Sequence, residues 1–516
     1  MFYSNYQKAL TDIKSRIGRL MDTNKPHPDF LYANISDFRN GPERSYMLVA
    51  QKYYVNEPDI LDRKRYFINR NGVLQEATNL TNAKLAHPSL RKLVKQKVNY
   101  LLSKEFSVQT EDKVFSEKLD NYLTKAFYKL LKNYVADGIV NGIAYLQPYY
   151  DPQGNLMFKR LPPEEVVPFW RDAEHTILDA FIRFYIVRQY LPNGSKKEVT
   201  KVEYYTPQGT WYFVEDAKGL IPDPDPDRGG LQGHFKIRQQ QTLPSGETLE
   251  TYEPVVWDRI PLIPVKYNAE ELPLLKMVKP LLDDYDTNCS DISNTLQDIP
   301  NNIKVVKNYD GTDKAEFTHN LAVYRTAFVS GDGDMYNVET KLDTAAVDSH
   351  LNRLRKDIYE AGSGVDTQAS DLGNASGVAL KFRYADLDID SDDLAMELSA
   401  ALEQLLWFIQ VDLTNRGEGN FFEVDFDIIF NTDGIINESE IINDAKNSSG
   451  IISEETIMIN HPWVTDPVAE KKRLDKEKKE NLKQAQDMMQ GGADNNFGTE
   501  NPTGTNTEDD DDDGDE

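Results

Sequence analysis

The apolar residues of this chain recur with a helical period in some stretches and alternate with polar residues in others. Residues 84–102 carry the first helical stripe, formed by Leu90, Leu93, Val94, Lys97, Val98, Leu101 and Leu102. A second helix is expected at about 114–141. Alternation over short runs, broken by turn sequences such as DPQG and PNG, then predicts an antiparallel β region at 143–214 and 235–267.

A long amphipathic helix is predicted at 272–299. Its apolar positions step by three and four residues, at Leu274, Val278, Leu281, Tyr285, Cys289, Ile292, Leu296 and Ile299. At 1.5 Å per residue this helix would run about 40 Å. Pro280 favours a start or a kink within it, and Pro300 ends it.

Short strands, two more long helices and a polar tail make up the rest of the pattern. Residues 301–343 predict strands at NIKVV, LAVYRTAFV and MYNVET, followed by a charged helix at 344–361. A glycine-containing loop at 362–377 leads to the longest helix, at 378–415. After these come a strand at 421–430, short helices at 437–485 with a cap at Ser453, and an acidic tail expected to be disordered.

The charge and cysteine content narrow the class of protein. There are 58 Lys and Arg against 85 Asp and Glu, a net charge of -27, so the chain is not built to grip nucleic acid phosphates. The single cysteine, Cys289, excludes an internal disulfide and is interpreted as an apolar residue on a helix face. No secretory signal opens the chain and no run of 18 apolar residues occurs, so we expect a cytoplasmic protein without a membrane span.

Enzymatic signatures are missing from the sequence. It has no phosphate-binding G-x-x-x-x-G-K-[ST] loop, no H-E-x-x-H and no C-x-x-C, and its seven histidines are scattered. The acidic run from Asp388 to Asp393 begins like a calcium loop, but Asp393 and Ser399 stand where Gly and Glu are needed. We interpret the run as a charged face or kink of the long helix. A loosely bound divalent cation and an acidic nuclease are the alternatives. The expectation is therefore no enzyme, no cofactor and no metal.

Several basic residues lie on the three long helices. They are Lys276, Lys279, Arg353, Arg355, Lys356, Lys381 and Arg383. Surface or intersubunit pairing with acidic neighbours is the ordinary interpretation. The alternative is that a few of them face DNA.

Four segments in the same order resemble the portal proteins of tailed double-stranded-DNA bacteriophages of the long, non-contractile-tailed type. RKLVKQKVNYLLSKEFSVQ (91–109) is similar to the first core helix of that family. DGIVNGIAYLQPYYDPQGNLMFKRLPPEEVVPFW (137–170) is similar to its helix-to-strand passage. LLKMVKPLLDDYDTNCSDISNTLQDI (274–299) is similar to its first stem helix. ASGVALKFRYADLDIDSDDL (375–394), the strongest match, covers the end of the tunnel loop and the helix after it.

The resemblance implies an α+β portal fold in which a helical and β body carries long stem helices. The implied division is an N-terminal region and wing at 1–271, stem helices at 272–298 and 344–361, a clip at 299–343, a tunnel loop at 362–375, a long helix and wing strand at 376–433, a crown at 434–485 and the acidic tail at 486–516.

The resemblance also implies a function and partners. Such a protein forms a homo-oligomeric ring, usually of twelve subunits, at one capsid vertex of the virion, after assembly in the host cytoplasm. Its implied partners are the terminase large subunit, then a head-to-tail adaptor, and the major capsid and scaffold proteins. DNA passes through the ring without sequence specificity. The competing interpretation is another head-completion or scaffold-like phage protein.

Two groups of candidate site residues follow from the resemblance. The tunnel-loop and DNA-channel group is Gly362, Gly364, Asp366, Asp371, Gly373, Gly377, Lys381 and Arg383. The clip group for partner binding is Val323, Tyr324, Phe328 and Tyr336. We expect the loop to act as a mobile constriction, because glycines ease backbone rearrangement. The alternative is a passive connector.

Overall fold

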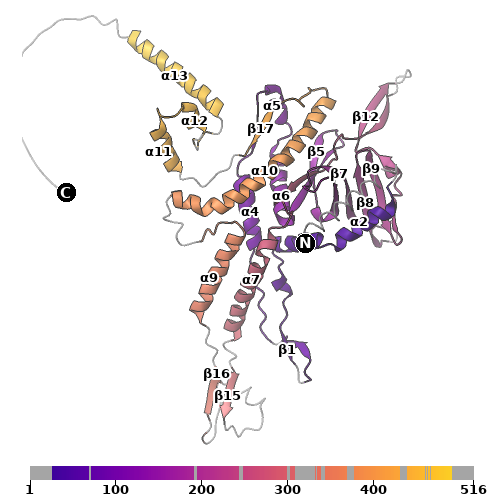
Figure 1. The fold of residues 1–516 in the computed structure, drawn as a ribbon, viewed down its shortest axis with the longest axis vertical. Coiled ribbons are helices and arrows are strands. Elements are labelled where there is room, and N and C mark those ends of the chain that lie inside the picture. Colours follow the sequence, from indigo (N-terminus) through magenta and orange to yellow (C-terminus); the bar gives the residue numbers. More distant parts are fainter. Residues whose placement is uncertain are drawn as a thin grey trace, which may run out of the picture. The chain divides into compact units, whose positions relative to one another are not determined.

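The computed structural model describes residues 26–490, apart from 69–70, 79, 191–193, 243–247, 299–302, 308–331, 333, 339–342, 369–376, 431–437, 460, 462 and 465–466. The chain divides into two compact units, residues 1–434 and 435–516. Helices and antiparallel sheets both contribute to the first unit (Figure 1), which confirms the expected α+β class.

A three-stranded sheet forms the centre of the first unit. Its order is β14 (Ile263–Lys266), β4 (Ile143–Tyr150) and β5 (Leu156–Leu161), with every pairing antiparallel. Helices α6 (Lys125–Asn141) and α10 (Gly377–Asn415) pack on it, and α4 (Ser89–Leu101) packs on both of these helices. The three helices supply much of the largest hydrophobic core. The hydroxyl of buried Tyr134 on α6 donates to the Ile263 carbonyl (2.7 Å), joining helix to sheet.

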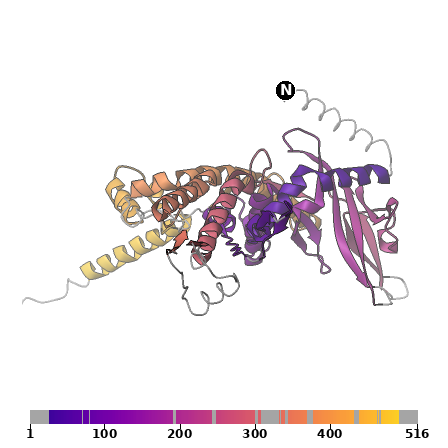
Figure 2. The same cartoon turned by 90° about the horizontal axis from the view of Figure 1, so that it is seen from below.

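A second, larger antiparallel sheet stands beside the first. Its order is β10 (Gly219–Pro222), β9 (Gly209–Asp216), β8 (Lys196–Thr206), β7 (Leu178–Tyr190) and β6 (Val166–Trp170), with β11 (Leu231–Gln232) on β9. Helix α2 (Pro28–Asn40) lies across this sheet through Leu31 and Ile35 (Figure 2), and α3 (Pro42–Tyr54) follows it. The hairpin β12 (Phe235–Thr242) and β13 (Thr248–Val255) completes the predicted antiparallel region, which is confirmed.

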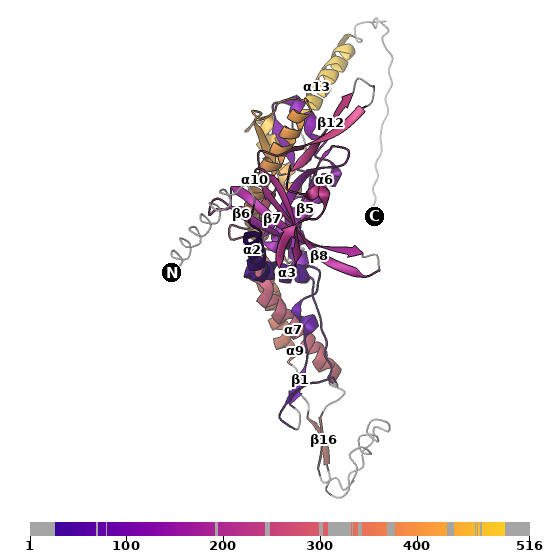
Figure 3. The ribbon, with the colours of Figure 1, turned by 90° about the vertical axis from the view of Figure 1, so that its right-hand side faces the viewer.

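Two helices project from the body side by side (Figures 1 and 3). They are α7 (Leu275–Asp298) and α9 (Thr344–Ala361). The chain between these two helices contains the strands β15 (Ile303–Lys307) and β16 (Asp334–Val338), which pair with each other. The short hairpin of β1 (Tyr66–Ile68) and β2 (Leu74–Glu76) is followed by an extended segment, 81–88, that runs along α7.

The predicted apolar stripe of α7 is right in its first half and wrong in its second. Leu274 and Val278 are buried, and Leu281 and Tyr285 pack on the main core, but Leu296 is 57% exposed. The buried positions further along are instead polar: Asp286, Ser290 and Asn294. Their side chains accept hydrogen bonds from the backbone N–H groups of His87 (3.2 Å), Leu85 (3.0 Å) and Ala83 (2.6 Å), respectively. A polar ladder with a spacing of four residues therefore replaces the apolar stripe.

Three other predicted elements differ in extent. The first helix begins at Ser89 instead of 84, because Pro88 disfavours helical conformation in the residue before it. The predicted helix at 114–141 is two helices, α5 (Lys113–Leu119) and α6, each with its own side-chain cap, Asp112 and Thr124. The strand at 421–430 is reduced to β17 (Phe426–Ile429), which pairs with β3 (Ser107–Thr110).

Helix α10 contains the one stretch in the described residues, Phe382–Asn415, that is long and apolar enough to cross a membrane by composition. Half of its apolar window is buried inside the protein, and residues such as Leu394, Leu398 and Ile409 belong to the main core. Packing of a core helix therefore accounts for its apolar character.

The second unit contains helices. These are α11 (Glu438–Ser448), α12 (Glu454–Ile459) and α13 (Pro467–Gln490). Ser453 caps α12 as predicted, accepting from the Thr456 N–H (3.2 Å). With 24 residues, α13 is longer than the short helices expected there. Residues 491–516, most of the acidic tail, lie outside the described residues.

Candidate functional site

The linker between α9 and α10 is the segment that the sequence singles out. Its described part, 362–368, packs on α4. Gly362 has an ordinary φ of -93°, but a Cβ added to it would lie 2.7 Å from a Leu93 methyl, and one added to Gly364 would clash with Leu93 as well. Here the two glycines therefore permit close packing. The expectation that they ease backbone rearrangement did not include this packing role.

Two consecutive side chains of α4 hold this part of the linker. The Gln96 amide donates to the Val365 carbonyl (2.7 Å) and accepts from the Val365 N–H (3.3 Å), as a neighbouring strand would. The Lys97 ammonium donates to the Ser363 carbonyl (3.1 Å). Ser363 itself has a φ of 45°, in the left-handed region that non-glycine residues rarely occupy. The chain leaving α9 is thus fixed to α4 through both backbone and side-chain groups.

An ion pair fixes the next residue of the linker to α9. Arg355 donates to the Asp366 carboxylate (2.6 Å) and to the Gln368 side chain (2.7 Å). The bond from Arg355 helps to hold the pKa of Asp366 below its usual value, against the opposing effect of burial. Asp366 was predicted to face the channel, but its carboxylate is already engaged within the subunit.

Lys97 also binds the long helix. Its side chain is completely buried, and its ammonium donates to the Asp390 carboxylate of α10 (2.7 Å), which also accepts from the Tyr267 hydroxyl (2.9 Å). Burial lowers the pKa of Lys97, whereas the Asp390 charge opposes that shift. Tyr100, one turn further along α4, donates to Asp388, and burial is the main cause of its raised pKa.

These contacts account for part of the acidic run from Asp388 to Asp393 on α10. Asp388 and Asp390 bind α4 and the body, whereas Asp392 and Asp393 are exposed. In the part of the chain that the structure describes, no group of three or more His, Cys, Asp or Glu side chains could hold a metal ion. Helix α10 continues through the run, from Gly377 to Asn415.

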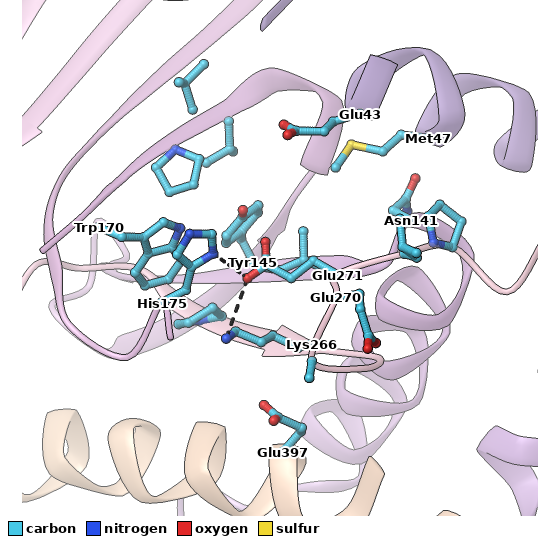
Figure 4. Close-up of a pocket in the computed structure, with 18 of the residues that line it drawn as sticks. Glu43, Met47, Asn141, Tyr145, Trp170, His175, Lys266, Glu270, Glu271 and Glu397 are labelled. Atoms are coloured by element: carbon cyan, nitrogen blue, oxygen red, sulfur yellow. Dashed lines mark hydrogen bonds and ion pairs between the residues drawn. The ribbon is translucent and has the colours of Figure 1, made fainter. Parts of the chain in front are cut away.

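A groove of about 1140 Å³ lies on another face of the first unit, between α3, the loop around His175 and α10 (Figure 4). His175 stacks on Trp170 with ring centroids 5.1 Å apart and binds Glu271 through Nδ1 (2.6 Å). Lys266 lies 3.5 Å from the same carboxylate and donates to the Glu174 carbonyl (2.6 Å). Glu271 is thus held by two basic side chains from the groove lining.

A model of one protein family covers most of the chain. It is described as phage portal protein, SPP1 Gp6-like, and it matches residues 40–484. The chain belongs to this family. A portal protein of Bacillus phage SPP1 is 28% identical over 437 residues, covering 84% of this chain and 83% of that protein. A portal protein of Clostridium phage phiCD119 is 27% identical over 452 residues, covering 84% of this chain and 93% of that protein.

A solved structure also aligns with the chain. It is titled as the neck of a native GTA particle computed with C12 symmetry, and it shares 10% identity at a TM-score of 0.40, covering 73% of this chain and 90% of that one. A score this low supports no argument about the fold. The family assignment of this phage portal protein rests on its sequence.

Some of the basic residues that were candidates for DNA contact in this portal protein, such as Arg355, are engaged within the subunit, whereas Arg353 and Lys356 are exposed. Lys279 binds Asp59 and Asp283 (both 2.6 Å), and the Lys276 ammonium lies 4.0 Å from the centre of the Tyr46 ring. Arg383 is half-buried and has an interaction partner. Lys381 lies on α10, but its side chain is not among those that the structure describes.

The remaining portal site predictions fall largely outside the described residues. Asp371 and Gly373 of the linker lie in 369–376, and Val323, Tyr324 and Phe328 of the clip lie in 308–331. Gly377 is the first residue of α10, and Tyr336 pairs with Val305 in the ladder of β15 and β16. Sequence reasoning missed Gln96, the role of Lys97 and the ladder of Asp286, Ser290 and Asn294. The only sequence signal for the roles of Gln96 and Lys97 was the presence of a lysine within an apolar stripe.

Proposed function

We propose that copies of this portal protein assemble into a closed ring of twelve subunits, through which double-stranded DNA enters and leaves the phage head at one capsid vertex. The family assignment supports the proposal. On this proposal the protein is a component of the virion and works without catalytic chemistry of its own.

An exposed apolar stripe on α10 carries the assembly part of the proposal. Phe382, Ile389 and Met396 are 78%, 64% and 68% exposed in the single subunit. They are seven residues apart, so they lie on one face of the helix, opposite the buried Leu387 and Leu394. A large apolar face in contact with water is typical of a surface that another protein covers. A second copy of the chain is the partner that a ring supplies.

The hairpin of β1 and β2 supports the same proposal. All six of its strand residues are exposed, including Tyr66, Ile68 and Leu74, which share one face. An isolated two-stranded hairpin is marginally stable in water, so a partner surface is expected to cover it.

The charge supports a channel that passes DNA without holding it. A net charge of -27 per subunit repels phosphates, and each tight phosphate contact would oppose sliding. Because Lys279 and Arg355 are already paired with carboxylates, they are not available as strong phosphate anchors.

For partner docking, we propose the segment between α7 and α9, which would meet the terminase large subunit and later the head-to-tail adaptor. Val323, Tyr324, Phe328 and Tyr336 supply apolar and aromatic groups in a short module.

Charged substitutions test the docking proposal. Tyr324→Asp and Phe328→Asp should leave rings intact and abolish capture of the cognate terminase large subunit, with Asn320→Asp as a charge-matched control. Normal capture by both variants would contradict the docking role. Loss of rings would show that these residues are core or assembly residues instead.

A further inference from the structure

The first 25 residues have a pattern and a charge unlike the rest of the chain. Tyr3, Tyr6, Leu10, Ile13, Ile17 and Leu20 follow one another at alternating intervals of three and four residues. This spacing is typical of an amphipathic helix about 30 Å long. The segment contains five Lys or Arg and two Asp, whereas the whole chain is strongly acidic.

Two basic residues would lie directly beside the apolar face of this helix. At 100° per residue, Lys14 and Arg16 fall on opposite sides of the apolar face of such a helix, immediately beside it. The segment would therefore present an apolar stripe with a positive charge on each edge. A matching surface needs an apolar floor and an acidic residue on each side.

The groove of Figure 4 has this arrangement. Its lining includes the exposed apolar side chains of Tyr46 and Met396. Glu43 of α3 and Glu397 of α10 lie on opposite sides of it, with Glu270 between. Within the described residues, no ion pair of these three carboxylates is found, whereas the neighbouring Glu271 is bound by His175 and lies 3.5 Å from the Lys266 ammonium. Six carboxylates line the groove against two lysines, Lys266 and Lys276. The groove therefore combines exposed apolar side chains with an excess of negative charge.

Residues 1–25 also join the first unit close to the groove. Helix α2 starts at Pro28, and its second half supplies Asn34, Asp37 and Phe38 to the groove lining. Residues 34–38 lie roughly 10–15 Å along the helix from its start. The prolines at 26 and 28 prevent a continuous helix from 1 into α2 and favour a change of direction. A segment of 25 residues is long enough to turn back and cover the groove.

From these observations, we propose that residues 1–25 dock into this groove of their own subunit as an amphipathic helix. Ile13 and Ile17 face Met396 and Tyr46, and Lys14 and Arg16 pair with Glu43 and Glu397. The proposal assigns Met396, at one end of the exposed stripe on α10, to a contact within the subunit, and leaves Phe382 and Ile389 to the contact between copies. It does not depend on the proposed DNA channel.

A cysteine pair in the full-length chain tests the contact. In a Cys289→Ser background, Met396→Cys is combined with either Ile13→Cys or Ile17→Cys. Mild oxidation should link at least one pair within a single chain, giving a fast-migrating monomer band on a non-reducing gel. The matched control combines Ile17→Cys with Tyr190→Cys, which is exposed at the end of β7, and should stay unlinked.

The alternatives give different bands. Links between chains would place the segment of a neighbouring copy in the groove and overturn the assignment to the same subunit. Absence of a link in both Met396 pairs would overturn docking altogether.

Charge reversal tests the pairing. Lys14→Glu with Arg16→Glu should slow the intrachain link about tenfold, because two attractive pairs become repulsive. Glu43→Lys with Glu397→Lys should do the same, and all four substitutions together should restore the rate. Unchanged rates in both reversed variants would overturn the proposed pairs.

Discussion

At the scale of single residues, one ion pair explains two unusual features of the sequence. Lys97 interrupts an otherwise apolar stripe, and Asp390 belongs to an acidic run on a long helix. They are 293 positions apart and 2.7 Å from each other. The sequence could place each residue on its helix, but periodicity within a helix carries no information about a partner so distant. This is why the run was interpreted as a solvated face.

Replacing Lys97 should therefore be costly. Lys97→Met leaves the Asp390 carboxylate without its cation, and the free energy of unfolding should fall by about 3 kcal/mol, the cost of breaking a buried pair. Adding Asp390→Asn should recover part of this loss, because the charge is then removed as well. Lys95→Met, an exposed position on the same helix, is the control. Equal urea midpoints for Lys97→Met and the wild type would contradict the pairing.

Buried tyrosines should determine how stability responds to alkaline pH. Burial raises the pKa of Tyr134 well above 10 in the folded protein, so above pH 10 the unfolded chain loses this proton and the folded one keeps it. The contribution of Tyr134 is therefore fully present below pH 10 and is lost as pH rises.

Tyr134→Phe tests this dependence. At pH 8 it should cost about 1 kcal/mol for the lost hydrogen bond to Ile263. Above pH 10 the decline in stability should become shallower by up to about 1.4 kcal/mol per pH unit. Denaturant unfolding at several pH values measures both effects, and parallel curves for variant and wild type would argue against the shift.

At the scale of elements, the sequence locates long helices well and polar packing poorly. The predictions of 344–361 and 378–415 agree with α9 and α10 almost to the residue, because long helices repeat their pattern many times. The second half of α7 was misjudged, since its buried face bonds to the backbone of 81–88 and not to apolar side chains. In the linker, composition alone could not distinguish a glycine needed for packing from one needed for flexibility.

The packing role of Gly364 has a direct test. Gly364→Ala should displace the linker from α4 and cost about 1–3 kcal/mol, because the new methyl group meets Leu93. Leu93→Ala in the same chain should restore protection of the amides of 362–368 in hydrogen exchange, despite its own cost to the core.

A matched glycine provides the control. Gly229→Ala should be neutral, since its Cβ would meet only one atom, at 3.6 Å. If Gly364→Ala leaves amide exchange in 362–368 unchanged, the close approach to Leu93 does not matter, and flexibility is the better explanation of that glycine.

At the scale of the whole molecule, the family and the acidic character could be predicted from the sequence, while the structure shows where apolar surface remains uncovered. Phe382, Ile389 and Met396 could not be distinguished from core residues by periodicity, because α10 has apolar residues on both faces. Their exposure is a property of the folded subunit. It connects the family assignment to a physical reason for assembly.

The most direct test is to measure the mass of the purified protein and to image it by negative stain. A twelve-subunit ring predicts a single species of about 0.7 MDa, twelve times 59.0 kDa, with a central hole. Ile389→Lys should shift the population toward subunits, and Asp393→Lys, an exposed position on the same helix, should not. A wild-type mass near 59 kDa across a wide concentration range, with no rings in the images, would contradict the proposed ring.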